Sequence, residues 1–205
     1  MLNAFAATLR SFATPRACAA ALLTGGLLLL GGCATSSATN QSQYGQRAGD
    51  VKAVDATIED QVEKSLDQAD ARLGDARIRA HSYNGRVLLV GQVPSEELQK
   101  KAAQVAEQLR GVETVHNELT VAARLPASQR LTDTWLTTNV VSQLATNDHI
   151  DSSKLKVTTE NASVYLMGIV SRQEAERIVA AVSGVSGVQR IVKVFEYLDG
   201  STAAN

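Results

Sequence analysis

Two stretches of the chain, NGRVLLVGQVPSEE at residues 84–97 and NASVYLMGIVSRQE at residues 161–174, match one another without a gap. In both, an asparagine-led turn precedes a strand with apolar residues or glycine at every second position, and a polar helix start follows. The matched strand positions are Val87, Leu89, Gly91 and Val93, and Val164, Leu166, Gly168 and Val170. A repeat of about 70 residues predicts two tandem domains rather than a solenoid of short units.

Each copy has the pattern helix, strand, strand, helix, strand. Ile58, Val62 and Leu66 recur every four residues, which predicts one apolar helix face. Asn84-Gly85 predicts a type I′ hairpin turn, and Asn161-Ala162 is a weaker version of it. The strand–helix–strand crossover favours a right-handed connection. The expected fold class is α+β, with two domains that each form a small three-stranded sheet with two helices packed on one face (α-β-β-α-β).

Three finer expectations concern the sheets. Glycine weakens a strand, so Gly91 and Gly168 predict a close backbone approach by a helix. The stretch 111–121 is matched to 184–194, which makes the helix before the last strand about one turn shorter in the second copy. Tyr165 and Met167 should face away from the core, where a contact with the other domain or core filling is expected rather than a ligand pocket.

The chain begins like an exported protein. Arg10 and Arg16 precede an apolar run of 14 residues at 17–30, which is too short to span a bilayer of ~30 Å. Leu30-Gly31-Gly32-Cys33 resembles a bacterial lipobox, whose cleavage leaves Cys33 as an acylated first residue. An ordinary secretory signal with an incidental cysteine is the alternative. Because Ala34 rather than Asp follows Cys33, the usual sorting pattern of diderm bacteria implies the outer membrane.

These patterns divide the chain into six expected segments. They are a lipoprotein signal peptide at 1–32, a lipidated N-terminus with a flexible tether at 33–53, a first domain at 54–124, a linker at 125–130, a second domain at 131–198 and a disordered tail at 199–205.

Composition and spacing exclude several functions. Removal of Arg10 and Arg16 changes 20 basic against 21 acidic residues to 18 against 21, a net charge near −3, which argues against nucleic-acid binding. Only Cys33 would remain, since Cys18 lies in the removed segment, so neither a disulfide nor a cysteine metal site is expected.

No chemistry is visible in the remaining motifs. His81, His116 and His149 lie in different predicted elements without paired spacing, so no metal site is expected. The sequence has no nucleophile with a nearby base and no glycine-rich phosphate loop. We therefore expect a protein that is not an enzyme and carries no cofactor.

The apolar helix, the V-x-L-x-G-x-V hairpin strand, the alanine-rich helix and the G-V-x-x-V strand together resemble the BON domain. The similarity covers roughly residues 33–198 and is tightest at DTWLTTNVVSQLAT (133–146) and KVTTENASVYLMGIVSRQEA (156–175). Two such copies behind a lipobox resemble the dual-BON outer-membrane lipoproteins. That resemblance implies a periplasm-facing protein that binds anionic phospholipid through its second domain, with a role in envelope integrity and division-site association.

The first helix of the second copy differs from its counterpart. The stretch TWLTTNVVSQLAT at 134–146 has no charged residue and holds the only tryptophan, whereas the equivalent 56–68 has five charged residues. At 3.6 residues per turn, the face turned away from the core consists of Leu131, Trp135, Thr138, Asn139 and Ser142.

This face is the expected membrane contact. A tryptophan suits a membrane interface. Arg130, expected just before the helix, and the free N–H groups of the first turn could together receive a lipid phosphate. Two alternatives remain open. Trp135 could instead pack against the first domain, or the charge-free helix could bind an envelope protein, which would make the chain a periplasmic adaptor.

Overall fold

The structure, a computed structural model, describes residues 49–198. All of them fall within one compact unit. The expected signal peptide, Cys33, most of the expected tether and the tail therefore lie outside the described residues.

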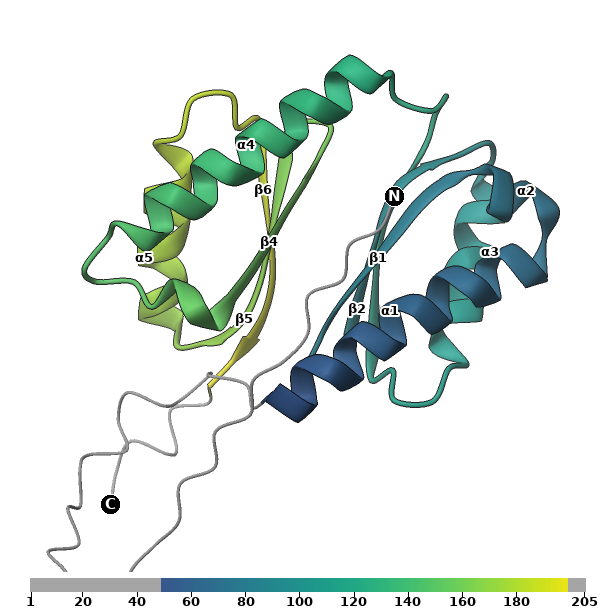
Figure 1. The fold of residues 1–205 in the computed structure, drawn as a ribbon, viewed down its shortest axis with the longest axis horizontal. Helices are drawn as coiled ribbons and strands as arrows, with labels where there is room; N and C mark the ends of the chain where they lie inside the picture. Colours follow the sequence, from purple (N-terminus) through teal and green to yellow (C-terminus); the bar gives the residue numbers. More distant parts are fainter. Residues whose placement is uncertain (1–48, 199–205) are drawn as a thin grey trace, which may run out of the picture. The chain divides into compact units, whose positions relative to one another are not determined.

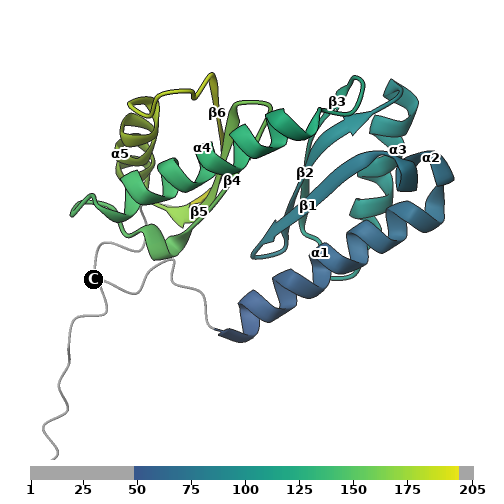
Figure 2. The same ribbon diagram turned by 45° about the horizontal axis from the view of Figure 1, so that its top comes forward.

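The first domain begins with a long helix and ends with an edge strand (Figure 1). Its elements are α1 (Gly49–Ala69), α2 (Ala71–Asp75), β1 (Arg77–Tyr83), β2 (Arg86–Val93), α3 (Glu96–Glu107) and β3 (Thr114–Val121). β1 pairs antiparallel with β2, and β2 pairs parallel with β3. Helices α1 and α3 cover one face of this sheet (Figure 2). The short helix α2 was not expected.

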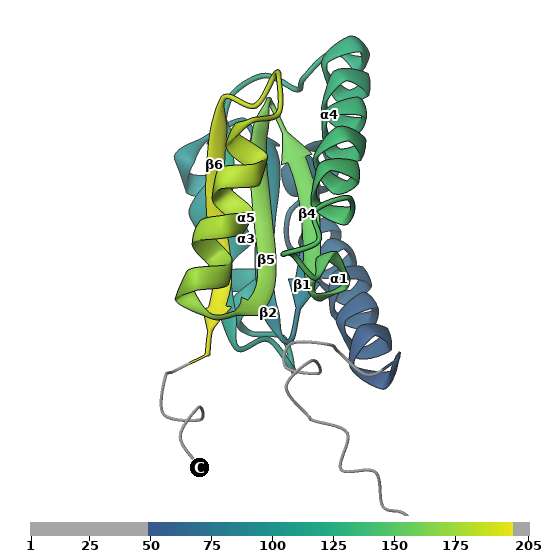
Figure 3. The same ribbon diagram turned by 90° about the vertical axis from the view of Figure 1, so that its left-hand side faces the viewer.

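The second domain repeats this arrangement. Its elements are α4 (Ala127–Ala145), the 3-10 turn η2 (Ser152–Lys154), β4 (Leu155–Glu160), β5 (Ser163–Val170), α5 (Arg172–Ser183) and β6 (Arg190–Tyr197). The sheet order is β4-β5-β6 with the same antiparallel and parallel pairings. Figure 3 shows α4 and α5 on one face of this sheet. The predicted α+β fold with two tandem three-stranded domains is confirmed.

The predicted apolar stripes build the two cores. Ile58, Val62 and Leu66 of α1 are buried against the helix-covered face of β2, and Leu136, Val140 and Leu144 of α4 do the same in the second domain. Both turns have the positive φ angles of a type I′ hairpin: 54° and 74° at Asn84 and Gly85, and 49° and 57° at Asn161 and Ala162.

Two helices begin earlier than expected. α1 starts at Gly49, inside the segment 33–53 that was expected to be a tether, and α4 starts at Ala127, inside the expected linker 125–130. The additional first turns, at 49–53 and 127–130, project beyond the core and contain no buried residue. They therefore lack the apolar stripe from which the helices were predicted. A helix start needs only a permissive first turn, and Pro126 before α4 supplies one, since its carbonyl accepts the N–H of Arg130 at 3.3 Å.

The glycines in β2 and β5 have a different cause from the one expected. A side chain at Gly91 would place its Cβ 1.9 Å from the carbonyl oxygen of Arg77, and the φ of Gly91 is +126°. A Cβ at Gly168 would lie 2.8 Å from the Leu155 side chain and 2.9 Å from the Lys154 carbonyl oxygen. The close approach is therefore made by the neighbouring strand and the turn before it, not by a helix.

The expected alignment of the third strands was wrong by three residues. α3 and α5 both have 12 residues, so the second helix is not shorter. Gly187, with φ +97°, takes the place of Gly111, with φ +88°, and both lie against a core side chain of the first helix. Val115 pairs with Val87 and Ile191 pairs with Val164. The tandem repeat in GVSGV offered two glycines, and the first of them is part of the helix end.

The sheet face that is not covered by helices contributes, in both domains, to one shared apolar cluster. Tyr83, Leu88 and Val90 of the first domain cluster with residues of the second domain, namely Tyr165, Met167 and Val194. The expectation that Tyr165 and Met167 contact the other domain is confirmed.

Polar contacts surround this cluster. Glu160, which is buried, accepts hydrogen bonds from Arg77 at 2.8 and 2.9 Å and from Gln92 at 2.7 Å. His81 Nε2 lies 3.3 Å from Thr158 Oγ1. Burial, aided by the nearby Lys156 ammonium, lowers the pKa of His81 to about 4. His81 is therefore neutral in the folded protein at neutral pH.

We expect Gly91→Ala to destabilise the protein by about 3 kcal/mol or more, because both the backbone conformation and the Arg77 carbonyl oppose a side chain. Gly168→Ala should cost less, about 1–3 kcal/mol, because its φ is ordinary, but the Leu155 side chain and the Lys154 carbonyl must both shift. Denaturant unfolding of both variants checks this order. Equal losses, or a larger loss at Gly168, would contradict the account given for Gly91.

His81 should make stability depend on pH. Its pKa is depressed from 6.5 to about 4, so its contribution is complete above pH 6.5 and is lost as the pH falls toward 4. The full loss is on the order of 3 kcal/mol. Between pH 6.5 and 5, where most carboxylates stay ionised, the free energy of unfolding should fall in the wild type. In His81→Gln the same window should be nearly flat, and an unchanged slope would refute the assignment to His81.

Candidate functional site

The outer face of α4 is open to solvent over most of its length. Leu131 and Trp135 are 71% and 60% exposed. Of the other predicted residues, Arg130, Thr138 and Ser142 are exposed and Asn139 is half-buried. Trp135 is therefore not buried against the first domain. Val141, 44% exposed on a flank of the helix, adds an apolar residue that was not predicted for the site.

The threonine hydroxyls of α4 donate hydrogen bonds within the helix itself. Thr134 Oγ1 donates to the Arg130 carbonyl at 2.9 Å, and Thr138 Oγ1 donates to the Thr134 carbonyl at 3.0 Å. Thr132 does the same with Ser128 at 3.1 Å. Such bonds to the preceding turn let hydroxyls leave bulk water without an unsatisfied donor. The surface of α4 is therefore less polar than its threonine-rich sequence implies.

A buried aspartate fixes the rotation of α4. The carboxylate of Asp133 accepts the N–H groups of Asn161 and Ala162, each at 2.9 Å, and this residue is only 4% exposed. Thr137 Oγ1 adds a bond of 2.8 Å to Thr159 Oγ1. These contacts hold one side of the helix to the hairpin tip. The opposite side, with Leu131 and Trp135, must then point outward.

The first domain has the same clamp. Asp55 accepts the N–H of Asn84 at 2.9 Å, the N–H of Gly85 at 3.1 Å and the hydroxyl of Ser82 at 2.7 Å. Sequence reasoning missed both aspartates. The signal was present, because Asp55 and Asp133 each stand three residues before the first core residue of their helix, Ile58 and Leu136.

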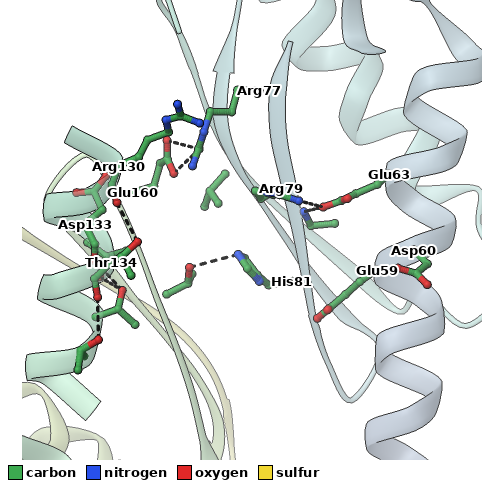
Figure 4. Close-up of a pocket in the computed structure, with 16 residues that line it drawn as sticks. Glu59, Asp60, Glu63, Arg77, Arg79, His81, Arg130, Asp133, Thr134 and Glu160 are labelled. Atoms are coloured by element: carbon green, nitrogen blue, oxygen red, sulfur yellow. Dashed lines mark hydrogen bonds and ion pairs between the residues drawn. The ribbon is translucent and has the colours of Figure 1, made fainter. Parts of the chain in front are cut away.

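Arg130 does not precede the helix, as had been expected. It lies within the first turns of α4, and its N–H is already bonded to Pro126. Its side chain lines a cleft of about 530 Å³ (Figure 4). Among residues 49–198, no ion pair involves the Arg130 guanidinium.

This cleft runs beside α1, β1, β4 and α4. Its charged lining consists of five carboxylates, from Glu59, Asp60, Glu63, Asp133 and Glu160, and three guanidinium groups, from Arg77, Arg79 and Arg130. Figure 4 shows Arg79 turned to Glu63, and Arg77 turned to Glu160. Carboxylates outnumber cations, so the cleft favours a cationic ligand over an anionic one.

Other kinds of site find no support in the part of the chain that the structure describes. Residues 49–198 contain no helix that is both long and apolar enough to cross a bilayer. Within the same residues, no three histidine, cysteine or acidic side chains come together as metal ligands would.

Comparisons with a family model and with known proteins agree on the family of this chain. The BON domain model matches residues 54–123 and 132–199. The chain is 35% identical to "Outer membrane lipoprotein DolP" of Haemophilus influenzae over 184 residues, 87% of this chain and 95% of that protein. It is 33% identical to the "21 kDa hemolysin" of Actinobacillus pleuropneumoniae over 153 residues, 74% and 78% of the two chains.

One solved structure, the C-terminal domain of CdsD from the type III secretion system of Chlamydia trachomatis, is 11% identical. It covers 68% of this chain and 96% of its own, with a TM-score of 0.28, too low to support a comparison of sites. The two domain matches and the near full-length similarity to DolP agree with the duplicated fold, and the chain belongs to the BON-domain family, among its dual-domain members of the DolP type.

Proposed function

We propose that this protein is an outer-membrane lipoprotein that faces the periplasm and binds anionic phospholipid through the outer face of α4. The similarity to a relative named as an outer membrane lipoprotein supports the location. The observation that carries the lipid assignment is the exposure of Leu131 and Trp135 on a helix without an exposed acidic residue.

The chemistry of this face suits the boundary between headgroups and acyl chains. Trp135 offers a large apolar ring with one N–H donor, which is typical of residues at membrane interfaces. The threonine hydroxyls are bonded to the helix backbone, so lowering them into the interface leaves no donor unsatisfied. The face is therefore able to enter the interface at little polar cost.

The charge on α4 favours anionic lipid. The helix has two charged residues, Arg130 and Asp133, and Asp133 is buried and satisfied by the hairpin tip. Only Arg130 presents its charge to the surroundings. A single exposed cation contributes about 1 kcal/mol at an anionic surface, which adds to the apolar contact.

Attachment would then use two signals. Acyl chains on Cys33, which lies outside the described residues, would hold the protein to the leaflet, and α4 would bring the second domain onto it. One acyl chain alone binds only marginally, so several chains or a second contact are needed for firm attachment. We further propose that this attachment supports envelope integrity and division-site association.

The alternative is a periplasmic adaptor in which the same helix face binds an envelope protein. Exposed apolar patches mark protein contacts as well as membrane contacts. Vesicle binding in the absence of any other protein separates the two functions.

Trp135→Glu tests the lipid contact. The side chain is 60% exposed, so the free energy of unfolding should change by about 0.5 kcal/mol or less. Flotation with anionic vesicles should fall about tenfold, because the variant loses the interfacial ring and gains a charge that anionic headgroups repel. The measurement uses residues 34–205, which contain every core residue of both domains and no acylated cysteine.

Thr57→Glu is the matched control, since Thr57 occupies the equivalent exposed position on α1. It adds the same charge to the first domain and should leave flotation unchanged. Equal losses from both variants would show that net charge, and not the α4 face, governs binding. Full flotation of Trp135→Glu would disprove the lipid contact at this residue.

Cys33→Ser tests the anchor. Serine cannot accept the thioether-linked lipid, so the variant should remain unprocessed at this position and leave the outer-membrane fraction. Mass spectrometry of the N-terminus and membrane fractionation check this. Acyl chains found on the N-terminus of the variant would contradict the lipobox assignment.

A further inference from the structure

The two domains differ in whether side chains bind the outward N–H groups of their edge strands, β1 and β4. In an antiparallel hairpin, alternate residues of an edge strand point their N–H groups away from the partner strand. In β1 these residues include Ala80 and Ser82, which lie opposite Leu89 and Val87. Unpaired groups of this kind are a template for another strand unless they are covered.

The edge of β1 is closed by side chains. The Ala80 N–H donates to Glu63 Oε1 at 3.4 Å, and the Ser82 N–H donates to Glu59 Oε1 at 2.6 Å. Both glutamates come from α1, four residues apart on the same side of the helix. Lys156 of β4 donates to the Ser82 carbonyl at 3.3 Å and also binds Glu59. No further strand can pair here without displacing these bonds.

The edge of β4 lacks this protection. Thr159 and Val157 lie opposite Val164 and Leu166, the positions equivalent to Ser82 and Ala80. Their N–H groups point away from β5, and within residues 49–198 no side chain accepts a hydrogen bond from either, although Thr159 is 8% exposed and Val157 is half-buried. The reason is visible in α4, where the counterparts of Glu59 and Glu63 are Thr137 and Val141. The Thr137 hydroxyl bonds to the Thr159 hydroxyl at 2.8 Å and not to a main-chain N–H of the edge, and the valine has no acceptor.

We propose that the free edge of β4 is a docking site for an extended, basic peptide segment of a partner protein. The segment would add a strand to β4, using main-chain hydrogen bonds to Val157 and Thr159 for affinity. Side chains at every second position of the segment point to one face, so basic residues at that spacing would meet the carboxylates beside the edge.

The cleft of Figure 4 supplies both the room and the charge for this occupant. Thr158, Thr159 and Glu160 of β4 line it, and its volume of about 530 Å³ falls in the range of ligand-binding clefts. Five carboxylates and three guanidinium groups line it, and the Lys156 ammonium pairs with Glu59, so the net charge at the cleft is −1. Asp60 on α1 has no partner among the ion pairs of the described residues, so it can receive a lysine or arginine of the segment.

This site overlaps the proposed lipid contact only at its border. Arg130 and Thr138 line the cleft as well as belonging to the proposed lipid contact, whereas Leu131 and Trp135 on the outer face of α4 do not line it. The proposed partner is a peptide and not a phospholipid, and its site leaves Leu131 and Trp135 uncovered.

The experiment transfers the closed edge of the first domain to the second. Val141→Glu places a carboxylate at the position equivalent to Glu63, where it can accept the Val157 N–H. The probe is the peptide acetyl-Lys-Val-Lys-Thr-Lys-Val-amide, titrated against residues 34–205 without lipid. The affinity of the variant should be about tenfold lower, as the loss of one or two main-chain hydrogen bonds implies.

The sign of this change separates pairing from simple attraction. Gln143→Glu adds the same charge to α4 at an exposed position that faces elsewhere, and it should keep or slightly raise the affinity. If charge alone drew the peptide, both glutamates would strengthen binding. A Val141→Glu protein that binds as tightly as the wild type, or more tightly, overturns the proposal.

Hydrogen exchange of the wild type gives a second readout that needs no variant. Without peptide, the N–H groups of Val157 and Thr159 should exchange faster than those of Ala80 and Ser82, and saturating peptide should slow them at least tenfold. Unchanged exchange at both residues, or equal binding of the peptide with glutamate in place of lysine, contradicts the proposal. Dimerisation of the peptide-free protein through this edge would assign the site to a second copy instead. Trp135→Glu should bind the peptide normally, so the lipid contact and this site fail separately.

Discussion

A buried carboxylate ties the first helix of each domain to the tip of its own hairpin, and the placement of every exposed residue on that helix depends on it. Asp55 and Asp133 each accept two consecutive turn N–H groups that the type I′ geometry leaves pointing inward. Because a buried unsatisfied N–H is costly, the helix cannot rotate without losing these bonds. The apolar stripe and the clamp together fix which side of α4 faces outward, and Trp135 is on that side.

The duplication makes this constraint visible. Residues bound by the core or the clamp are equivalent in the two copies, whereas residues outside both have diverged. In α1 those outer positions carry Glu59, Asp60 and Glu63, which solvate the helix and cover the β1 edge. In α4 they carry uncharged residues, and the threonine hydroxyls bond to the helix backbone. The two domains share one fold, but the outer positions of their first helices differ in charge: they are acidic in α1 and uncharged in α4.

Periodicity predicted the main helices and strands and the outer face of α4, because burial against a sheet imposes a regular apolar spacing on helices and strands. It did not predict the short helix α2, which has one buried apolar residue. It did not predict contacts that depend on a single backbone angle or a single buried polar group. Gly91 is required by the Arg77 carbonyl of the next strand, and local sequence does not specify that approach. The choice between the two glycines of GVSGV likewise depends on where α5 ends. The aspartate clamp repeats at one fixed spacing, so comparison of the two copies could have revealed it.

One difference between the copies accounts for both proposed surfaces. Carboxylates on the outer side of a helix oppose contact with anionic headgroups, and in this fold two of them, Glu59 and Glu63 of the first domain, also cover the edge of the sheet. Thr137 and Val141 occupy these two positions in α4, so the second domain lacks both the negative charges and the acceptors for the edge N–H groups. An uncovered edge is an aggregation hazard for a protein free in solution. In the second domain the hazard is limited, because the edge lies in a cleft lined by charged residues that disfavour hydrophobic strands. The proposed lipid contact and the proposed peptide site therefore have one common origin, the loss of these two carboxylates from the first helix of the second domain.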